Sequence, residues 1–484
     1  MMAPVPVRLT TTGGVVTVEL TRTDGHRTRV GQHPHTESAV PTSASSALLT
    51  DHYELTMLDA ALRDGAADRP AVFEAFTRKL PEGRRFGVTA GLGRIVEEFE
   101  RFRFDDPTLA YLDDHNVVSP ATLAWLSGYR FRGEVYAFHE GEPFVPEEPV
   151  LTVSATFADA VVLETLVLSI LNHDSAIASA AARIAHAAEG RSLLEFGTRR
   201  THEQAAVAAA RAAYIAGFDG TSNLAAGQRY GVPTLGTSAH AFTLLHDDER
   251  AAFRAQVDAL GPATTLLVDT YDVRRGIERA LEAAGPSLGG IRIDSGDLAE
   301  HARAARAQLD AAGATDTRIV VSGDLNEDRI RALRDAPIDG YGVGTDLVTG
   351  GGAPTAWFVY KLVARALEPG GPCEPVAKAG GNKATVGGRK RVSRRLDAGR
   401  ATGEVVRPWD ARVPAGERPL QVPVVVDGER VYDPSLEDVR AHYAAACAEL
   451  PRDAFAPTDA GEPTPDDWPV LDHLDARPEQ EVAT

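Results

Sequence analysis

One histidine, His240, stands in a run of small residues at positions 236–242, whose sequence is GTSAHAF. The preceding residues 232–235, VPTL, predict a short strand. A histidine packed in a core does not need small neighbours, whereas a histidine that meets a bulky ligand does. An imidazole can carry a phosphoryl group as a nucleophile when a carboxylate holds its other ring nitrogen. The pattern therefore favours a His240 that meets a ligand, with a packed histidine as the alternative.

Three further segments combine glycine with serine, threonine and aspartate, as phosphate-binding turns do. They are DSGD at 294–297, SGD at 322–324 and GVGTD at 342–346. Small residues leave backbone N–H groups free to meet a phosphate. Each segment alone is more often a plain turn or helix cap, but three together favour a ligand with more than one phosphate. None carries the lysine of the common nucleotide-binding loop, and no GxGxxG opens a helix.

Charged and aromatic residues accompany these segments. Arg199 and Arg292 stand near glycines, and a planar guanidinium suits a carboxylate or a phosphate. Arg292 lies within an apolar run, so a solvated surface position explains it poorly. Phe196 follows a predicted strand, where it would stack on a flat ring or belong to the core. The carboxylates that would serve Mg²⁺, ribose hydroxyls or a histidine, with helix capping as the plain alternative, are Asp269, Asp294 and Asp324.

One scaffold must bring these residues together, and residues 191–345 predict a barrel. Apolar runs alternate there with one-sided helical patterns about seven times, which is typical of parallel strands covered by helices. Seven units favour closure into an α/β barrel over an open sheet. Every polar segment follows a predicted strand, so all would meet at the rim where barrel enzymes have their active sites. The predicted strands are residues 192–195, 217–220, 233–236, 265–269, 290–294, 318–323 and 340–344.

The flanking regions predict a second part of the molecule and two extensions. Short apolar runs split by glycine and proline occupy 131–156 and 361–392, which is typical of strands. Residues 1–45 offer little to bury beyond a candidate strand at 15–18, and the tail is dense in proline and acidic residues. We therefore expect a disordered extension at 1–45, an α/β sheet segment at 46–158, a catalytic barrel at 159–365, a return to the sheet at 366–450 and a flexible tail at 451–484.

The composition narrows the class of protein. A chain of 484 residues with 43% hydrophobic side chains allows more than one domain, and the formal net charge of −19 argues against nucleic-acid binding. The two cysteines, Cys373 and Cys447, give neither zinc spacing nor a disulfide framework and suit a reducing cytoplasm. The apolar stretch 161–171 is too short for a membrane span, and no secretory signal is evident. We expect a cytoplasmic protein without a membrane or nucleic-acid partner.

Seven motifs together resemble the nicotinate phosphoribosyltransferase family, a type II phosphoribosyltransferase family, across about residues 48–445. They are LLTDHYELTML, EFGTRRTHE, GFDGTSNLAA, GTSAHAF, LLVDTYDV, IRIDSGDL and YGVGTDLVTG. The resemblance implies transfer of a phosphoribosyl group from 5-phosphoribosyl 1-diphosphate to nicotinate, giving nicotinate mononucleotide and diphosphate. It also implies Mg²⁺, ATP as co-substrate and a homodimer with shared active sites. The implied fold is an incomplete parallel α/β barrel plus an α+β domain, whose antiparallel sheet comes from N- and C-terminal segments.

The resemblance also implies a role for each matching residue. His240 would be the transiently phosphorylated histidine, and Asp269 would orient it. Nicotinate would meet Tyr53 from the other subunit, Phe196, Thr237, Arg292 and Ser222. The phosphoribosyl and diphosphate groups would meet Arg199, Asp294, Ser295, Gly296, Ser322, Gly323, Asp324, Gly344 and Thr345. Mg²⁺ would bind through the diphosphate, with Asp294 as a candidate ligand.

The sequence departs from the family at 378–390, KAGGNKATVGGRK. Glycines stand there at the places of the family's serine and proline. The departure concerns Lys378, Lys383 and Lys390, which would hold ATP or diphosphate, and leaves the barrel motifs unchanged.

Three alternatives stay open. A nicotinamide enzyme would place a carboxylate near the amide, where this chain has neutral Ser222 and Asn223. A quinolinate enzyme would work without ATP and would show more basic residues for two carboxylates. A non-catalytic barrel protein would have lost His240, Asp294 or Arg292, all of which are present.

Overall fold

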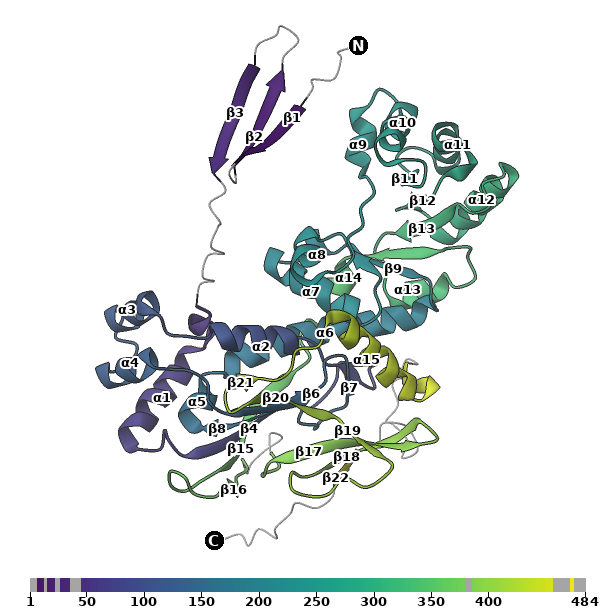
Figure 1. Ribbon diagram of the computed structural model, residues 1–484. Coiled ribbons are helices and arrows are strands. Elements are labelled where there is room, and N and C mark those ends of the chain that lie inside the picture. Colours follow the sequence, from purple (N-terminus) through teal and green to yellow (C-terminus); the bar gives the residue numbers. More distant parts are fainter. Residues whose placement is uncertain are drawn as a thin grey trace.

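A parallel sheet forms the half of the molecule that carries six of the seven motifs. The computed structural model describes residues 7–12, 15–21, 27–34, 45–378, 385–455 and 471–473. Within them, six parallel strands are ordered β10-β9-β14-β13-β12-β11 (Figure 1). Their bounds are β9 (Ser192–Glu195), β10 (Gly220–Thr221), β11 (Thr265–Leu267), β12 (Gly290–Ile293), β13 (Arg318–Ser322) and β14 (Gly340–Val343).

The curled sheet is an incomplete barrel, as the resemblance implies. A single parallel bridge between Thr221 and Thr234 extends it beyond β10. Within the described part of the chain, no strand pairing joins that bridge to β11, so the barrel stays open between these two edges.

Polar residues in the turns cap several of the helices that follow the strands. The side chains of Asp248, Asp272, Asp297 and Asn326 accept hydrogen bonds from the first turns of α10, α11, α12 and α13. Capping of these helices therefore does not explain the carboxylates of Asp269, Asp294 and Asp324, which the sequence had left as an alternative. The helices of this half are α7 (Glu203–Ile215), α8 (Leu224–Tyr230), α9 (His240–Leu245), α10 (Glu249–Leu260), α11 (Val273–Ala284), α12 (Leu298–Ala311), α13 (Glu327–Ala332) and α14 (Thr345–Val348).

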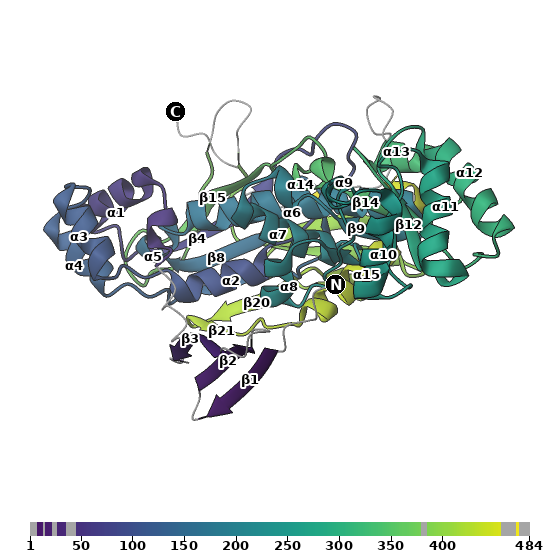
Figure 2. The same cartoon turned by 90° about the horizontal axis from the view of Figure 1, so that it is seen from above.

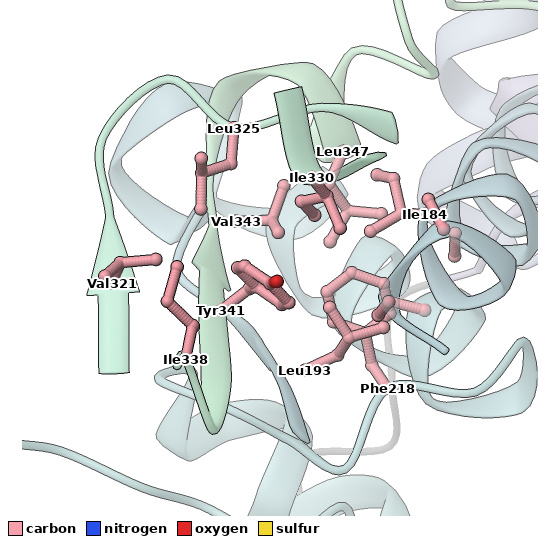
Figure 3. Packing of buried hydrophobic residues seen from close by; sticks show 14 of the residues in the cluster. Ile184, Leu193, Phe218, Val321, Leu325, Ile330, Ile338, Tyr341, Val343 and Leu347 are labelled. Carbon is pink, nitrogen blue, oxygen red and sulfur yellow. The ribbon is translucent and has the colours of Figure 1, made fainter. Parts of the chain in front are cut away.

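Apolar side chains on one face of the strands hold the barrel together. Figure 3 shows Tyr341 and Val343 of β14 packed between Val321 of β13 on one side and Leu193 and Phe218 on the other. All five side chains are buried. Register partners on neighbouring strands share this face, whereas the alternate side chains of β9 and β13 are only partly buried.

An antiparallel sheet forms the second half, and its strands come from before and after the barrel. Seven strands are ordered β16-β15-β4-β8-β6-β20-β21. The last strand within the segment predicted as barrel, β15, pairs with β4, so the antiparallel sheet extends into residues 358–365. The strands are β4 (Pro70–Thr77), β6 (Glu134–Phe138), β8 (Leu151–Thr156), β15 (Phe358–Arg365), β16 (Glu374–Pro375), β20 (Gln421–Val426) and β21 (Glu429–Arg430).

Smaller sheets and helices complete this half. The barrel helices α10 to α12 lie at the opposite end of the molecule from α1, α3 and α4 (Figure 2). The remaining strands are β5 (Gly87–Val88), β7 (Pro143–Phe144), β17 (Lys390–Asp397), β18 (Arg400–Pro408), β19 (Glu417–Pro419) and β22 (Leu471–His473). The helices are α1 (His52–Asp64), α2 (Leu92–Arg101), α3 (Asp106–Asp114), α4 (Pro120–Ser127), α5 (Phe157–Val161), α6 (Glu164–Ala188) and α15 (Leu436–Glu449).

The long helix α6 connects the two halves. The segment Phe157–Ala188, which contains α5 and α6, is long and apolar enough to cross a membrane by length and composition, but 67% of its most apolar window is buried inside the structure. It packs against α7, α13 and β5. Its apolar character is therefore explained by packing in the core.

The N-terminal segment contains regular structure where the sequence predicts a disordered extension. Three antiparallel strands, β1 (Val7–Thr12), β2 (Val15–Thr21) and β3 (Arg27–Pro34), form a separate sheet. Of the predicted tail, β22 pairs with β18. The other residues of the tail from 456 onward lie outside the described part of the chain.

Candidate functional site

A cavity of about 580 Å³ opens at the carboxyl-terminal rim of the parallel strands. The turns after five different strands contribute to its wall, which explains why residues far apart in sequence share it. The predicted site residues that line it are Phe196, Arg199, Ser222, Thr237, His240, Arg292, Asp294, Ser322, Gly323, Asp324, Gly344 and Thr345.

His240 is held between two residues from the end of β11. Its Nδ1 lies 3.1 Å from the Thr270 hydroxyl, and its Nε2 lies 3.9 Å from Oδ1 of Asp269. The side chain is 39% exposed, whereas that of Asp269 is 1% exposed. A ring that faces a cavity and has a carboxylate behind it can act as a nucleophile, and the exposure rules out the alternative of a fully packed histidine.

Asp269 is fixed in place through only one of its two oxygens. Oδ2 accepts hydrogen bonds from the backbone N–H of Asp294, at 2.8 Å, and from the Ser295 hydroxyl, at 2.7 Å. The buried Oδ1, which faces His240, has no hydrogen-bond partner among the described residues. Oδ1 lies beyond hydrogen-bond length from Nε2, and its negative charge favours a proton on that nitrogen of His240.

Arg292 brings a buried positive charge to the same cavity. Its side chain is 13% exposed, and its Nη1 donates a 2.7 Å hydrogen bond to the Thr237 hydroxyl. The guanidinium carbon lies 5.7 Å from the centre of the Phe196 ring. Burial lowers the pKa of Arg292, and its Nε has no hydrogen-bond partner within the described part of the chain. The arrangement suits a flat anionic ligand that meets both the ring and the guanidinium.

Two glycines give the cavity its shape. A Cβ on Gly342 would lie 2.5 Å from the Phe196 ring, so a larger residue would displace that ring. Gly323 has φ +111°, and a Cβ there would lie 2.6 Å from the carbonyl oxygen of Asp294. This close approach lets the Ser322 hydroxyl donate to the Asp294 carboxylate.

Besides Tyr53, three predicted site residues do not line the cavity. Asp269 lies behind His240, and Ser295 is bonded to Asp269. Gly296 has φ +82°, and a Cβ there would lie 2.5 Å from His301. These residues support the wall of the cavity rather than form it.

Tyr53 lies outside this cavity in the described chain. It stands on α1, which both views of the molecule place at the opposite end from β12 (Figures 1 and 2). Its side chain is partly exposed, and burial together with the nearby Glu164 raises its pKa. Within one chain, Tyr53 does not reach the residues that it was predicted to join.

The two described lysines of the altered segment, Lys378 and Lys390, do not line the cavity. The ammonium of Lys390 is buried and lies 2.6 Å from Glu74, which comes from β4. Lys390 is therefore committed to a structural ion pair within its own chain. Lys378 is exposed, and Lys383 lies outside the described residues.

Two residues that the sequence did not single out take part in the site. Thr270 contacts His240, and its place next to Asp269 was the only available signal. Glu195 is buried, and its carboxylate accepts hydrogen bonds from the Gly197 N–H and the Thr221 hydroxyl. Glu195 thereby fixes the turn that presents Phe196.

Comparison with known proteins agrees with this geometry. The profile described as nicotinate phosphoribosyltransferase (NAPRTase) N-terminal domain matches residues 48–172, and that of the quinolinate phosphoribosyl transferase C-terminal domain matches 177–349. The chain is 56% identical over 431 residues to nicotinate phosphoribosyltransferase pncB1 of Mycobacterium tuberculosis, covering 86% of this chain and 94% of that one. The chain belongs to the nicotinate phosphoribosyltransferase family. It is an enzyme of pyridine nucleotide metabolism.

Two more distant relatives agree. The nicotinate phosphoribosyltransferase of Bacillus subtilis is 40% identical, with 76% of this chain and 77% of that one covered. The crystal structure of human nicotinic acid phosphoribosyltransferase superposes with a TM-score of 0.72 at 28% identity, covering 84% of this chain and 95% of that one. The family and the barrel fold expected from the motifs are thus confirmed.

Proposed function

We propose that this enzyme transfers the phosphoribosyl group of 5-phosphoribosyl 1-diphosphate to nicotinate and couples the reaction to ATP through a phosphate on His240. The observation that supports this most is the placement of His240 and Arg292 in one cavity. Arg292 suits the carboxylate of nicotinate, while His240 lines the cavity with a buried carboxylate behind Nε2 and the Thr270 hydroxyl beside Nδ1.

Recognition of nicotinate follows from charge. The carboxylate of the substrate would satisfy the open hydrogen-bonding capacity of Arg292, and Phe196 would stack on the pyridine ring. Ser222 is neutral, so this position has no carboxylate that would favour an amide over an acid. A quinolinate substrate is less favoured because its second carboxylate would need a second buried cation. The profile match to quinolinate enzymes covers only the barrel, whereas the N-terminal match is to nicotinate enzymes.

The phosphorylation step uses the two ring nitrogens differently. With its proton on Nε2 toward Asp269, His240 presents the lone pair of Nδ1. Nδ1 attacks the γ-phosphorus of ATP, the bond from that phosphorus to the bridging oxygen breaks, and ADP leaves with the electron pair. The ring becomes positively charged, and Asp269 stabilises that charge.

The phosphate groups of the second substrate would be bound along the rest of the rim. Arg199 and the turns at Ser322 and Gly344 line the cavity, and their N–H and guanidinium groups suit phosphate oxygens. No group of three metal-binding side chains occurs within the described residues. Asp294 and Asp324 fit Mg²⁺ that is held mainly by substrate oxygens, and the ion would neutralise charge on the departing diphosphate.

We further propose a homodimer in which Tyr53 completes the partner's nicotinate site, because Tyr53 is remote from the cavity of its own chain. Mixing inactive Tyr53→Ala and inactive His240→Ala subunits tests this. Heterodimers should regain part of the activity, since one of their two sites would be intact. Heterodimers that form and stay inactive would disprove the shared site. A cytoplasmic location remains a prediction from the two free cysteines.

Product analysis with purified protein tests the function itself. Labelled nicotinate with 5-phosphoribosyl 1-diphosphate and ATP should give nicotinate mononucleotide, and γ-labelled ATP should transfer acid-labile, base-stable label to the protein. His240→Asn should abolish labelling and change stability by no more than about 1 kcal/mol, because the side chain is partly exposed. Labelling that persists in this variant, or that maps to His173, His202 or His246, would refute the assignment. Release of CO₂ from quinolinate would favour the alternative enzyme.

A further inference from the structure

Thr270 is the residue in contact with the reactive nitrogen of His240. It follows Asp269 in the turn between β11 and α11, and its hydroxyl lies 3.1 Å from Nδ1. The cap of α11 is Asp272, so the turn does not need the Thr270 hydroxyl for its own structure. Among the described residues, that hydroxyl has no hydrogen-bond partner other than His240. Its position is therefore best explained by the histidine.

The direction of this hydrogen bond follows from Asp269. A carboxylate only accepts hydrogen bonds, and its buried Oδ1 faces Nε2, so the ring proton belongs on Nε2. A neutral imidazole with its proton on Nε2 has an accepting lone pair on Nδ1. The Thr270 hydroxyl must then be the donor. Asp269 and Thr270 together select the tautomer and hold the ring from both sides.

We propose that Thr270 is a positioning residue for phosphoryl transfer to His240, an inference that rests on the function proposed above. Before the reaction, its hydroxyl donates to the Nδ1 lone pair and fixes the rotation of the ring, and this hydrogen bond breaks as the same lone pair turns to the γ-phosphorus. When Nδ1 bonds to the γ-phosphorus and ADP departs, Nδ1 can no longer accept a hydrogen bond. The hydroxyl then donates to a non-bridging oxygen of the new phosphoryl group, which lies one bond further out. Thr270 keeps its proton and forms no covalent bond in this step.

Two substitutions separate the hydroxyl from the shape of the side chain. Thr270→Val keeps the branched shape and removes the hydroxyl, while Thr270→Ser keeps the hydroxyl and removes the methyl group. Thr402→Val is the matched control, because Thr402 is an exposed residue of β18 whose hydroxyl, among the described residues, donates only to the Arg395 carbonyl. The full-length protein is used throughout, and thermal unfolding checks that each variant is folded.

The test is the rate of labelling from γ-labelled ATP in a single turnover, measured over a range of ATP concentrations. We expect Thr270→Val to lower the maximal labelling rate at least tenfold with an ATP half-saturation within threefold of the parent. Thr270→Ser and Thr402→Val should label within threefold of the parent rate. A merely structural role of Thr270 would lower the labelling rate of Thr270→Ser and Thr270→Val alike, or would raise the ATP concentration needed for half-saturation. Either result would overturn the proposal.

The same experiment separates this inference from the proposed function. A parent protein that takes up label while Thr270→Val labels equally fast would overturn the role of Thr270 and leave the phosphohistidine intact. A parent protein that takes up no label would overturn both.

Discussion

Replacing Asp269 with asparagine should harm phosphorylation more than removing its side chain. Oδ2 of Asp269 accepts two hydrogen bonds, from the Asp294 N–H and the Ser295 hydroxyl. Asparagine can satisfy both donors only with its carbonyl oxygen, and its NH₂ group would then face Nε2 of His240. An NH₂ donor favours a lone pair on Nε2, which moves the ring proton to Nδ1. The nitrogen that must attack ATP would then carry the proton.

The size of the effect has two parts. Two unit charges at about 4 Å interact by about 4 kcal/mol at an effective dielectric constant of about 20, and the separation here is 3.9 Å. Because solvent screens the partly exposed histidine, we take the stabilisation of the positively charged ring by Asp269 as roughly 1.4–2 kcal/mol. Losing it would slow phosphorylation about ten- to thirtyfold. Asp269→Ala should show this loss alone. The wrong tautomer costs up to about 10⁴-fold in serine proteases, so Asp269→Asn should lose between about 10² and 10⁴.

Rapid-quench labelling with saturating γ-labelled ATP measures this difference directly. Ser295→Ala is the control, because it removes one hydrogen bond to Asp269 and leaves the charge, and it should label within about threefold of the parent rate. Unfolding curves must show that all three variants are folded. An asparagine variant that labels as fast as the alanine variant, or faster, would refute the tautomer argument. Equal loss in all three would point instead to collapse of the turn.

Three other measurements test separate parts of the structure. Arg292→Gln should lose about 2–5 kcal/mol in kcat/KM for nicotinate, with little change for nicotinamide, because the carboxylate loses its partner; equal losses would contradict the charge argument. Arg211→Met should lower the free energy of unfolding by about 3–5 kcal/mol, because Glu140, fully buried beside it, would lose its partner; a loss below about 1 kcal/mol would contradict this. Burial raises the pKa of Glu404 from 4.5 to about 7. The folded state then binds this proton more tightly than the unfolded chain, so Glu404 makes stability fall as pH rises through this window. Denaturant unfolding of Glu404→Gln should therefore show a flatter pH dependence, and an unchanged slope would contradict it.

The barrel was predictable because its signals are local. Six of the seven predicted strands overlap strands of the structure, and the seventh contains the bridge at Thr234. The least accurate of the predicted strands is 217–220, because the observed strand there is Gly220–Thr221. Gly217 has φ +107°, which is not a strand conformation, and Phe218 packs in the core. Apolar content alone cannot separate a buried turn from a short buried strand.

The sequence could not predict which distant residues pair in the fold. It suggests that Lys390 is an unpaired cation beside glycines, yet the carboxylate of Glu74, far away in sequence, forms an ion pair with it in the fold. The choice between capping and function for Asp269 and Asp294 depended on which neighbouring side chain caps each helix. Thr270 looked like an ordinary residue at a strand end, and only the approach of His240 gives it a role.

The open side of the barrel also explains where the histidine stands. The chain pairs with β10 at Thr234 and then leaves the sheet, and within the described residues nothing joins it to β11. Residues 235–239 are thereby free of sheet hydrogen bonds to β11, and they carry His240 across the gap. Asp269 and Thr270 stand on the other side of the same gap, at the end of β11. A closed barrel would pair these two edges through their backbones. In the incomplete barrel, the contact between the edges is made by the side chains that we assign to phosphoryl transfer.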